Sequence, residues 1–84
     1  MPYVAEKPDY AFYIGELAKL VSLPVSTIRY YTKLGLIHPL GKTPGGLSYY
    51  SPNVVEQLKR IKWLKETENL SLLEIKEQLE EGIM

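Results

Sequence analysis

The chain has 84 residues, which is enough for one compact domain and leaves no room for a second, ligand-binding domain. It contains no cysteine, so a disulfide framework and thiolate metal sites are excluded, and its one histidine cannot form a metal site by itself. No apolar run approaches the ~20 residues that a membrane-spanning helix needs, and the N-terminus lacks the order of a secretory signal. We therefore predict a cytoplasmic protein that does not contact a membrane.

The formal net charge is zero, but the charges are segregated along the chain. Between residues 19 and 65, eight lysines and arginines stand against a single acid, Glu56, whereas beyond residue 65 six glutamates stand against Lys76. This segregation favours a polyanionic partner for the basic middle of the chain, although solvated helix faces produce the same pattern.

Residues 1–11 predict a flexible N-terminal arm, because two prolines interrupt regular structure and no periodicity is visible. After this arm, apolar residues recur at the i, i+3, i+4 and i+7 spacing of a short amphipathic helix. They are Ile14, Leu17, Ala18 and Val21. A second helix is predicted over residues 24–34, with Ile28 on its buried side and Gly35 ending it in the left-handed conformation.

A hairpin is predicted over residues 38–50, because apolar stretches flank a turn rich in glycine and proline. A third helix then begins at Ser51-Pro52, where the serine is expected to cap the free amides and the proline to occupy the first helical position. The fourth helix opens with a capping box, in which Ser71 and Glu74 bond to each other's backbone amides. The predicted fold class is therefore mainly α, a winged helix-turn-helix with two short helices, a β-hairpin wing and two further helices, in one domain over residues 12–84.

The second helix is the predicted reading helix of this fold. A helix that enters the major groove must bury one face and present hydrogen-bond donors to phosphates and base edges from the other. Hydroxyls and cations occupy the arc that Ile28 leaves free, and these residues are Ser26, Thr27, Arg29, Tyr30 and Lys33. Arg29 can form a bidentate pair with guanine or hold a phosphate. An ordinary surface helix whose tyrosines cover a small core has the same spacing.

Several motifs in combination resemble the MerR-type DNA-binding domain. They are YIGELA (Tyr13 to Ala18), STIRYY (Ser26 to Tyr31), GLI (Gly35 to Ile37), TPGG (Thr43 to Gly46) and YSP (Tyr50 to Pro52). Each motif alone is weak, but the combination is fairly specific. The resemblance covers roughly residues 12 to 81, and the fold of this family agrees with the order of elements predicted above.

The resemblance implies that helix 24–34 inserts into the major groove of double-stranded DNA while the wing, residues 38–50, contacts the adjacent backbone. In the helix, the implied contacts fall on Ser26, Thr27, Arg29 and Tyr30. In the wing they fall on Lys42, Thr43, Gly46 and Tyr49. The third helix is expected to add phosphate contacts from Lys59 and Arg60, and Tyr13 occupies a position whose side chain often meets phosphate in this family.

Four positions depart from the pattern of the family. Ser26 stands where arginine is usual, Leu47 and Ser48 replace the tyrosine and arginine of the wing, and Thr32 replaces a glutamate. Because each missing arginine removes a contact with DNA, one copy of this domain should bind weakly and with a shallow salt dependence. The chain also ends before the long dimerisation helix and the effector domain of MerR-type regulators. We therefore expect a stand-alone domain, a part of a longer protein, or a protein that multimerises in some other way, and we expect several copies to act together.

These observations predict a small transcriptional regulator, or an architectural, excisionase-like protein, that binds specific DNA sequences. No nucleophile, base or metal set supports an enzyme, and no cofactor is expected. The alternative is a protein-interaction adaptor that kept the fold while its DNA contacts weakened. The acidic final helix, residues 71–81, is the predicted surface for self-association on DNA or for a protein partner.

Overall fold

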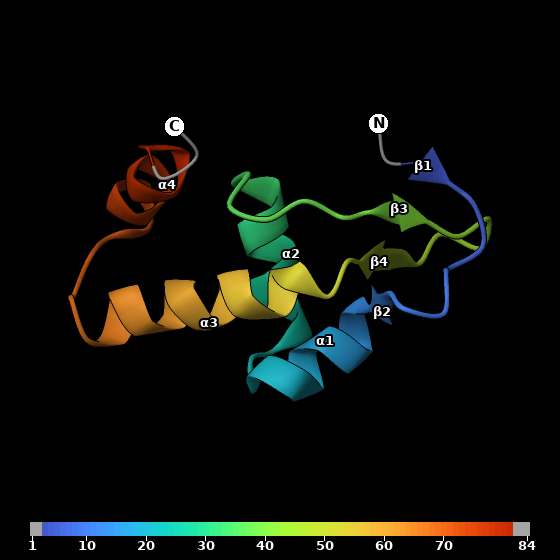
Figure 1. The fold of residues 1–84 in the computed structure, drawn as a ribbon, viewed down its shortest axis with the longest axis horizontal. Coiled ribbons are helices and arrows are strands. Elements are labelled where there is room, and N and C mark those ends of the chain that lie inside the picture. Colours follow the sequence, from blue (N-terminus) through green and yellow to red (C-terminus); the bar gives the residue numbers. More distant parts are fainter. Residues whose placement is uncertain (1–2, 82–84) are drawn as a thin grey trace.

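The computed structural model, which describes residues 3–81, contains four helices and a small sheet within that range (Figure 1). The helices are α1 (Ile14–Val21), α2 (Val25–Lys33), α3 (Asn53–Glu66) and α4 (Leu72–Glu81), and the strands are β1 (Tyr3–Val4), β2 (Phe12–Tyr13), β3 (Gly41–Lys42) and β4 (Ser48–Tyr50). The predicted mainly helical order, with a hairpin between the second and third helices, is confirmed. Figure 1 shows the sheet at one end of the molecule and α4 at the other, joined by α3.

One hydrophobic core joins the four helices and β4. Its fully buried side chains are Leu17, Ile28, Ile37, Tyr50, Leu58, Ile61 and Ile75. Burying a side chain of this size contributes about 1.5–3 kcal/mol. The apolar spacing that predicts each helix therefore also determines which face of it packs inward.

The backbone dihedrals of Ser22 and Pro24 shape the turn between α1 and α2. Ser22 is in the left-handed conformation at φ 55°, and its amide donates to the carbonyl of Ala18, which ends α1. Pro24 then occupies the N-cap of α2 with extended dihedrals, and its carbonyl accepts a hydrogen bond from the amide of Thr27. At the other end, Gly35 has φ 80°, the left-handed conformation predicted for it.

Strands β3 and β4 form the predicted hairpin, with Gly41 opposite Tyr49 and Lys42 opposite Ser48. Thr43 organises its turn, because its hydroxyl accepts a hydrogen bond from the amide of Leu47 at 3.1 Å and its own amide donates to the Leu47 carbonyl at 2.8 Å. Strand β2 extends this hairpin on the far side of β4 in antiparallel pairing.

Residues 3–11, which belong to the predicted flexible arm of residues 1–11, lie against the sheet in the structure, and residues 1–2 fall outside the described part of the chain. Strand β1 pairs in parallel with β3, and the amide of Ala5 donates to the carbonyl of Lys42 at 3.0 Å. The ammonium of Lys7 donates to the carbonyls of Pro8 and Ala11, at 3.1 and 3.0 Å. Parallel pairing between segments some forty residues apart leaves no local signal in the sequence, so the prediction treated this segment as separate from the fold.

Helices α3 and α4 begin differently from each other. Pro52 has helical dihedrals at the start of α3, as predicted, but the hydroxyl of Ser51 donates to the Asn53 side chain at 3.2 Å, so the predicted serine cap is corrected. The capping box of α4 is confirmed: the amide of Ser71 donates to Oε1 of Glu74 at 3.0 Å, and the amide of Glu74 donates to the hydroxyl of Ser71 at 3.2 Å.

The capping box makes the stability of α4 sensitive to acid. The hydrogen bond from the Ser71 amide, followed by the one that involves its side chain, holds the pKa of Glu74 below its usual value. A carboxyl whose pKa is lower in the folded state stabilises that state above its unfolded pKa, and the stabilisation is lost as the pH falls through the folded pKa. Because Glu74 is exposed, its ionisation contributes little to the free energy of unfolding. The direction in which that contribution changes with pH is therefore what an experiment can test.

We therefore expect Glu74→Gln to lower the free energy of unfolding at neutral pH and to leave it equal to that of the wild-type protein once the pH is below the folded pKa of Glu74. Urea denaturation at a series of pH values measures the difference. Glutamine can still accept the hydrogen bond from the Ser71 amide, so the substitution removes only the charge. A stability difference that is the same at neutral and acidic pH would contradict a stabilising role for the ionised Glu74 carboxylate.

Candidate nucleic-acid interface

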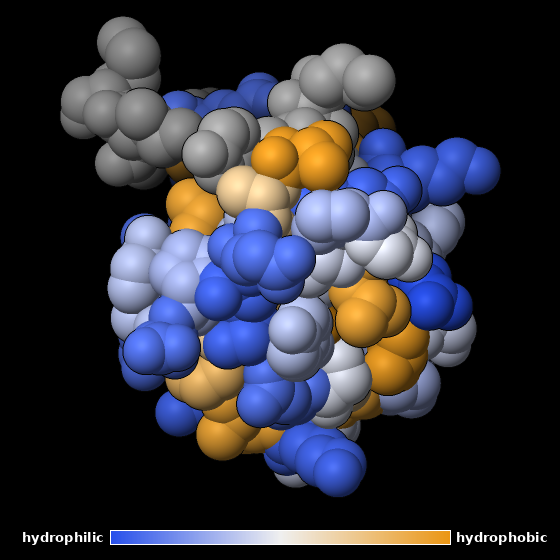
Figure 2. Space-filling view, turned by 90° about the vertical axis from the view of Figure 1, so that its right-hand side faces the viewer, coloured by the Kyte–Doolittle hydropathy of each residue, from blue (hydrophilic) through white to orange (hydrophobic). Residues whose placement is uncertain are grey.

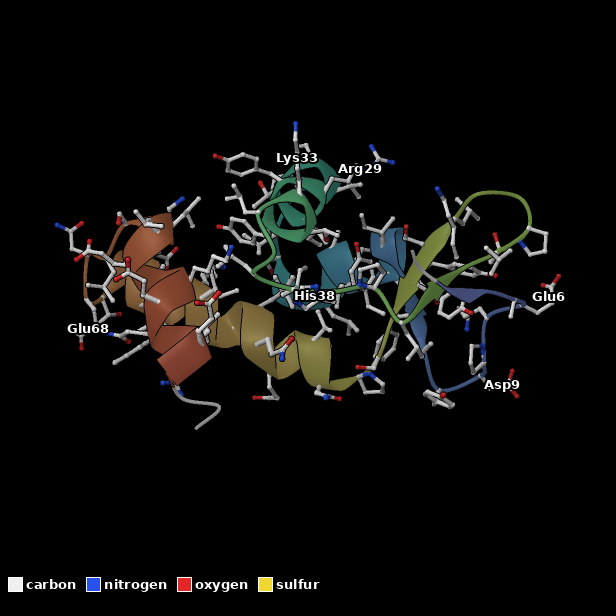
Figure 3. All side chains as sticks on the ribbon, turned by 90° about the horizontal axis from the view of Figure 1, so that it is seen from above. Glu6, Asp9, Arg29, Lys33, His38 and Glu68 are labelled. Atoms are coloured by element: carbon white, nitrogen blue, oxygen red, sulfur yellow. The ribbon has the colours of Figure 1, made fainter. Side chains whose placement is uncertain are left out.

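Helix α2 presents a polar outer side because its apolar residues face the core. Ile28 is fully buried and Tyr31 is 4% exposed, so the residues on the opposite arc reach solvent. That arc, which we call the crest of α2, consists of Ser26, Tyr30 and Lys33, and Arg29 lies beside it. Figure 3 shows Arg29 and Lys33 on the side of α2 that points away from α3, with Arg29 leaning toward the hairpin.

A hollow of about 270 Å³ lies between α2 and the hairpin, on the Arg29 flank of the crest. Its lining combines two cations with hydroxyl groups, and the residues are Ile14, Arg29, Thr32, Lys42, Gly46, Leu47, Ser48 and Tyr50. Arg29 comes from the reading helix and Lys42 from the wing, so the fold brings together two predicted contact residues that are distant in the sequence. Paired cations beside hydroxyls suit one strand of a phosphate backbone.

A second hollow of about 310 Å³ lies on the other flank of α2, between its first turns and the C-terminal half of α3. Thr27 of α2 and Lys62 and Lys65 of α3 line it, together with Leu23, Tyr31 and Glu66. Lys62 and Lys65 were not among the predicted contacts. Their i, i+3 spacing on α3 was a usable signal, because it places them on one side of that helix.

Lys59 and Arg60 lie elsewhere. Both are exposed, whereas Leu58 and Ile61, their neighbours in sequence, are fully buried, so the two cations lie on the outer side of α3. The outer sides of α2 and α3 face away from each other, and Lys59 lies 4.0 Å from Oε1 of Glu56. The structure therefore does not bring these two predicted contacts to the crest of α2.

Two predicted tyrosine contacts are also placed away from α2. Tyr13 lies opposite Tyr49 in the β2–β4 register, so the two side chains share one sheet face, and Tyr50, the next residue along β4, points to the other face. Tyr49 is 1% exposed, so its side chain is buried in this structure. Tyr13 lies under the ammonium of Lys7, which is 5.1 Å from its ring centroid.

The remaining predicted contacts belong to the turn of the wing. Thr43 is 8% exposed and its hydroxyl is bonded to the Leu47 amide, so it shapes the turn. Gly46 lines the first hollow with φ 93° and has open space around its α-carbon. Leu47, which stands where the family has tyrosine, is 56% exposed at the same turn.

Three acidic side chains lie at the two ends of the molecule, away from the crest of α2, whereas Glu66 lines the second hollow. Figure 3 shows Glu68 at the α4 end of the molecule and Glu6 and Asp9 at the sheet end. Figure 2 looks at this sheet end and shows its apolar residues in separate patches among hydrophilic ones. Within residues 3–81, no helix is long and apolar enough to cross a membrane.

Comparison with known proteins gives a consistent result. Residues 12–82 match the family described as MerR HTH family regulatory protein. The chain is 43% identical over 68 residues to the HTH-type transcriptional regulator ZntR homolog of Haemophilus influenzae, covering 79% of this chain and 48% of that protein. It is 36% identical over 67 residues to the HTH-type transcriptional regulator YfmP of Bacillus subtilis, covering 80% and 48%.

A third relative, a putative heat shock protein HspR of Streptomyces coelicolor, is 32% identical over 79 residues, with 94% of this chain and 52% of that protein covered. Among solved structures, a MerR-family transcriptional regulator from Bacillus cereus superimposes with a TM-score of 0.74 at 32% identity, over 82% of this chain and 51% of that one. The chain thus spans about half the length of the relatives that it matches.

Proposed function

This chain belongs to the MerR HTH family of regulatory proteins, and from that membership we propose that it binds specific sequences of double-stranded DNA and regulates transcription. The observation that carries the proposal is the crest of α2 with a cationic hollow on each flank. A major groove is bounded by two phosphate backbones, so a helix that enters it needs cations on both sides.

In this arrangement the crest of α2 reads base edges while the two flanks hold the backbones. Arg29 forms a bidentate contact with guanine or phosphate, and Ser26, Tyr30 and Lys33 add hydrogen bonds along the groove. Lys42 of the wing holds the backbone on one flank. Lys62 and Lys65, with the hydroxyl of Thr27, hold the backbone on the other.

The experiment that tests this function selects duplexes from a random-sequence pool and titrates the protein against a selected duplex and a scrambled one. We expect tighter binding to the selected duplex and affinity that falls as salt rises, because phosphate contacts release counterions. Equal binding to both duplexes, or none at low salt, would overturn the proposal.

Because the relatives are named as transcriptional regulators, we propose a role that is not enzymatic and a place in the cytoplasm beside the DNA.

Self-association is the second part of the proposal, because Ser26 and Ser48 leave one copy with few contacts. Helix α4 carries Leu73, which is 68% exposed, and the exposed Glu77 and Glu80 follow it one and two turns further along the helix. The outer side of α3 carries Trp63, which is 52% exposed, beside Lys59 and Arg60. An exposed apolar side chain among acids in one copy complements an aromatic side chain among cations in the next, and this head-to-tail contact joins further copies in the same way.

Charge reversal tests this contact. We expect that neither the Lys59→Glu Arg60→Glu protein nor the Glu77→Lys Glu80→Lys protein self-associates, and that an equimolar mixture of the two does, because all its contacts are again between opposite charges. Sedimentation velocity at low salt measures the species. A wild-type protein that stays monomeric, or a mixture that sediments as its separate components, would contradict the contact; Lys19→Glu on α1 is the control, expected to behave as wild type.

A further inference from the structure

A hydrogen bond between two hydroxyl groups, one on a buried tyrosine and one on a half-buried threonine, connects the reading helix to the wing. Tyr50 of β4 is 1% exposed, and its phenolic oxygen lies 2.8 Å from Oγ1 of Thr32 on α2. Thr32 in turn donates to the carbonyl of Ile28 at 2.8 Å. Since a threonine hydroxyl has a single hydrogen, the hydrogen bond between the two side chains must be donated by Tyr50.

Both partners of this hydrogen bond line the first hollow, the one that also holds Arg29 and Lys42. Thr32 follows Arg29 by three residues on α2, so both lie on the flank that faces the hairpin. Tyr50 shares a sheet face with Ser48, which pairs with Lys42 on β3. All five residues line the same hollow, and the Tyr50–Thr32 hydrogen bond joins α2, which carries Arg29, to β4, the strand that pairs with the Lys42 strand β3.

We propose that Tyr50 and Thr32 are positioning residues for DNA binding, which set the spacing between Arg29 and Lys42 so that the reading helix and the wing engage one DNA strand together. The inference rests on the proposed DNA binding and deepens it. Helix α1 packs against both α2 and β4, but apolar packing is non-directional, whereas a hydrogen bond from the buried Tyr50 to the half-buried Thr32 fixes distance and orientation. With this spacing fixed, binding of either Arg29 or Lys42 to a DNA phosphate brings the other side chain to its own contact on the same strand.

The test begins with Tyr50→Phe, which removes the hydroxyl and keeps the ring. It leaves no buried donor without an acceptor, because Thr32 still donates to Ile28. We expect the affinity for a duplex selected from a random pool to fall roughly three- to tenfold, the range that corresponds to the net worth of one hydrogen bond. Thr32→Ser retains the hydroxyl and is expected to bind as the wild type does.

A double-mutant cycle separates positioning from simple stabilisation. With Tyr50 present, Arg29→Ala and Lys42→Ala are expected to be non-additive, because loss of either contact weakens the other. In the Tyr50→Phe background the same two losses are expected to add. All affinities are measured at a temperature at which circular dichroism shows each variant to be folded.

The outcomes distinguish this inference from the proposed function. If the wild-type protein binds no duplex, the proposed function fails and the inference fails with it. If the wild-type protein binds, Arg29→Ala weakens it and folded Tyr50→Phe binds like the wild type, the inference alone is overturned. An unchanged non-additivity between Arg29 and Lys42 in the Tyr50→Phe background also overturns it.

Discussion

Arg29→Ala is expected to weaken binding to a selected duplex by about 1–3 kcal/mol, which is roughly a 5- to 150-fold rise in Kd. Arg29 is exposed beside the crest of α2 and lines the hollow that also holds Lys42. A guanidinium makes two parallel hydrogen bonds to guanine or phosphate, and no smaller side chain replaces both. The effect is large here because Ser26 and Ser48 stand where the family has arginines.

Fluorescence anisotropy with a labelled duplex measures the loss, and Lys19→Ala is its matched control. Lys19 is an exposed cation in the last turn of α1, away from the lining of both hollows, so its removal is expected to leave the affinity for a specific duplex nearly unchanged. An Arg29→Ala protein that is folded and binds as tightly as the wild type would contradict the role of the crest. That result would instead favour a protein-interaction adaptor with this fold.

Ile28→Ala is expected to lower the free energy of unfolding by about 2–5 kcal/mol, because it leaves a cavity where the fully buried side chain packs. Small domains are stable by only about 5–15 kcal/mol, so a loss of this size unfolds a substantial fraction of the protein. Ile28 is the residue that holds α2 on the core opposite its crest. The same substitution should therefore also remove DNA binding, through loss of the folded helix.

Urea denaturation followed by circular dichroism measures the change in stability. Val25→Ala, at the half-buried first position of the same helix, is the control and is expected to cost less, since the site is already open to solvent. Equal losses at the two positions would contradict the packing of α2 described here.

Local signals predicted the helices well. The spacing of Leu17, Ala18 and Val21 predicted α1, and all three are buried. Gly35 and the Ser71–Glu74 capping box predicted helix ends that the structure confirms, because both depend only on residues within one turn.

Local sequence patterns do not predict pairings between distant segments. The contact of β1 with β3 joins segments that the sequence keeps far apart. The face on which Tyr13 and Tyr49 lie depends on the β2–β4 register, which the sequence does not state.

The cations of α3 illustrate the same limit. The sequence shows that α3 carries several cations and predicts phosphate contacts from Lys59 and Arg60, but which cations lie beside α2 depends on how α3 is rotated on the core. Lys62 and Lys65 line the hollow with Thr27, and Lys59 and Arg60 do not. The packing of α3 therefore determines which cations lie on the Thr27 flank of the reading helix.

The central claim is that the crest of α2 enters a major groove while cations on both of its flanks hold the two backbones. The most direct measurement is the dependence of Kd on salt for a short duplex that holds one copy, compared among the wild-type, Lys62→Gln Lys65→Gln and Lys59→Gln Arg60→Gln proteins. The slope of log affinity against log salt is expected to become shallower by about 2 in the first variant, since each phosphate contact contributes roughly 0.9, and to stay unchanged in the second. A slope unaffected by Lys62→Gln Lys65→Gln and reduced by Lys59→Gln Arg60→Gln would contradict the placement of DNA on this face.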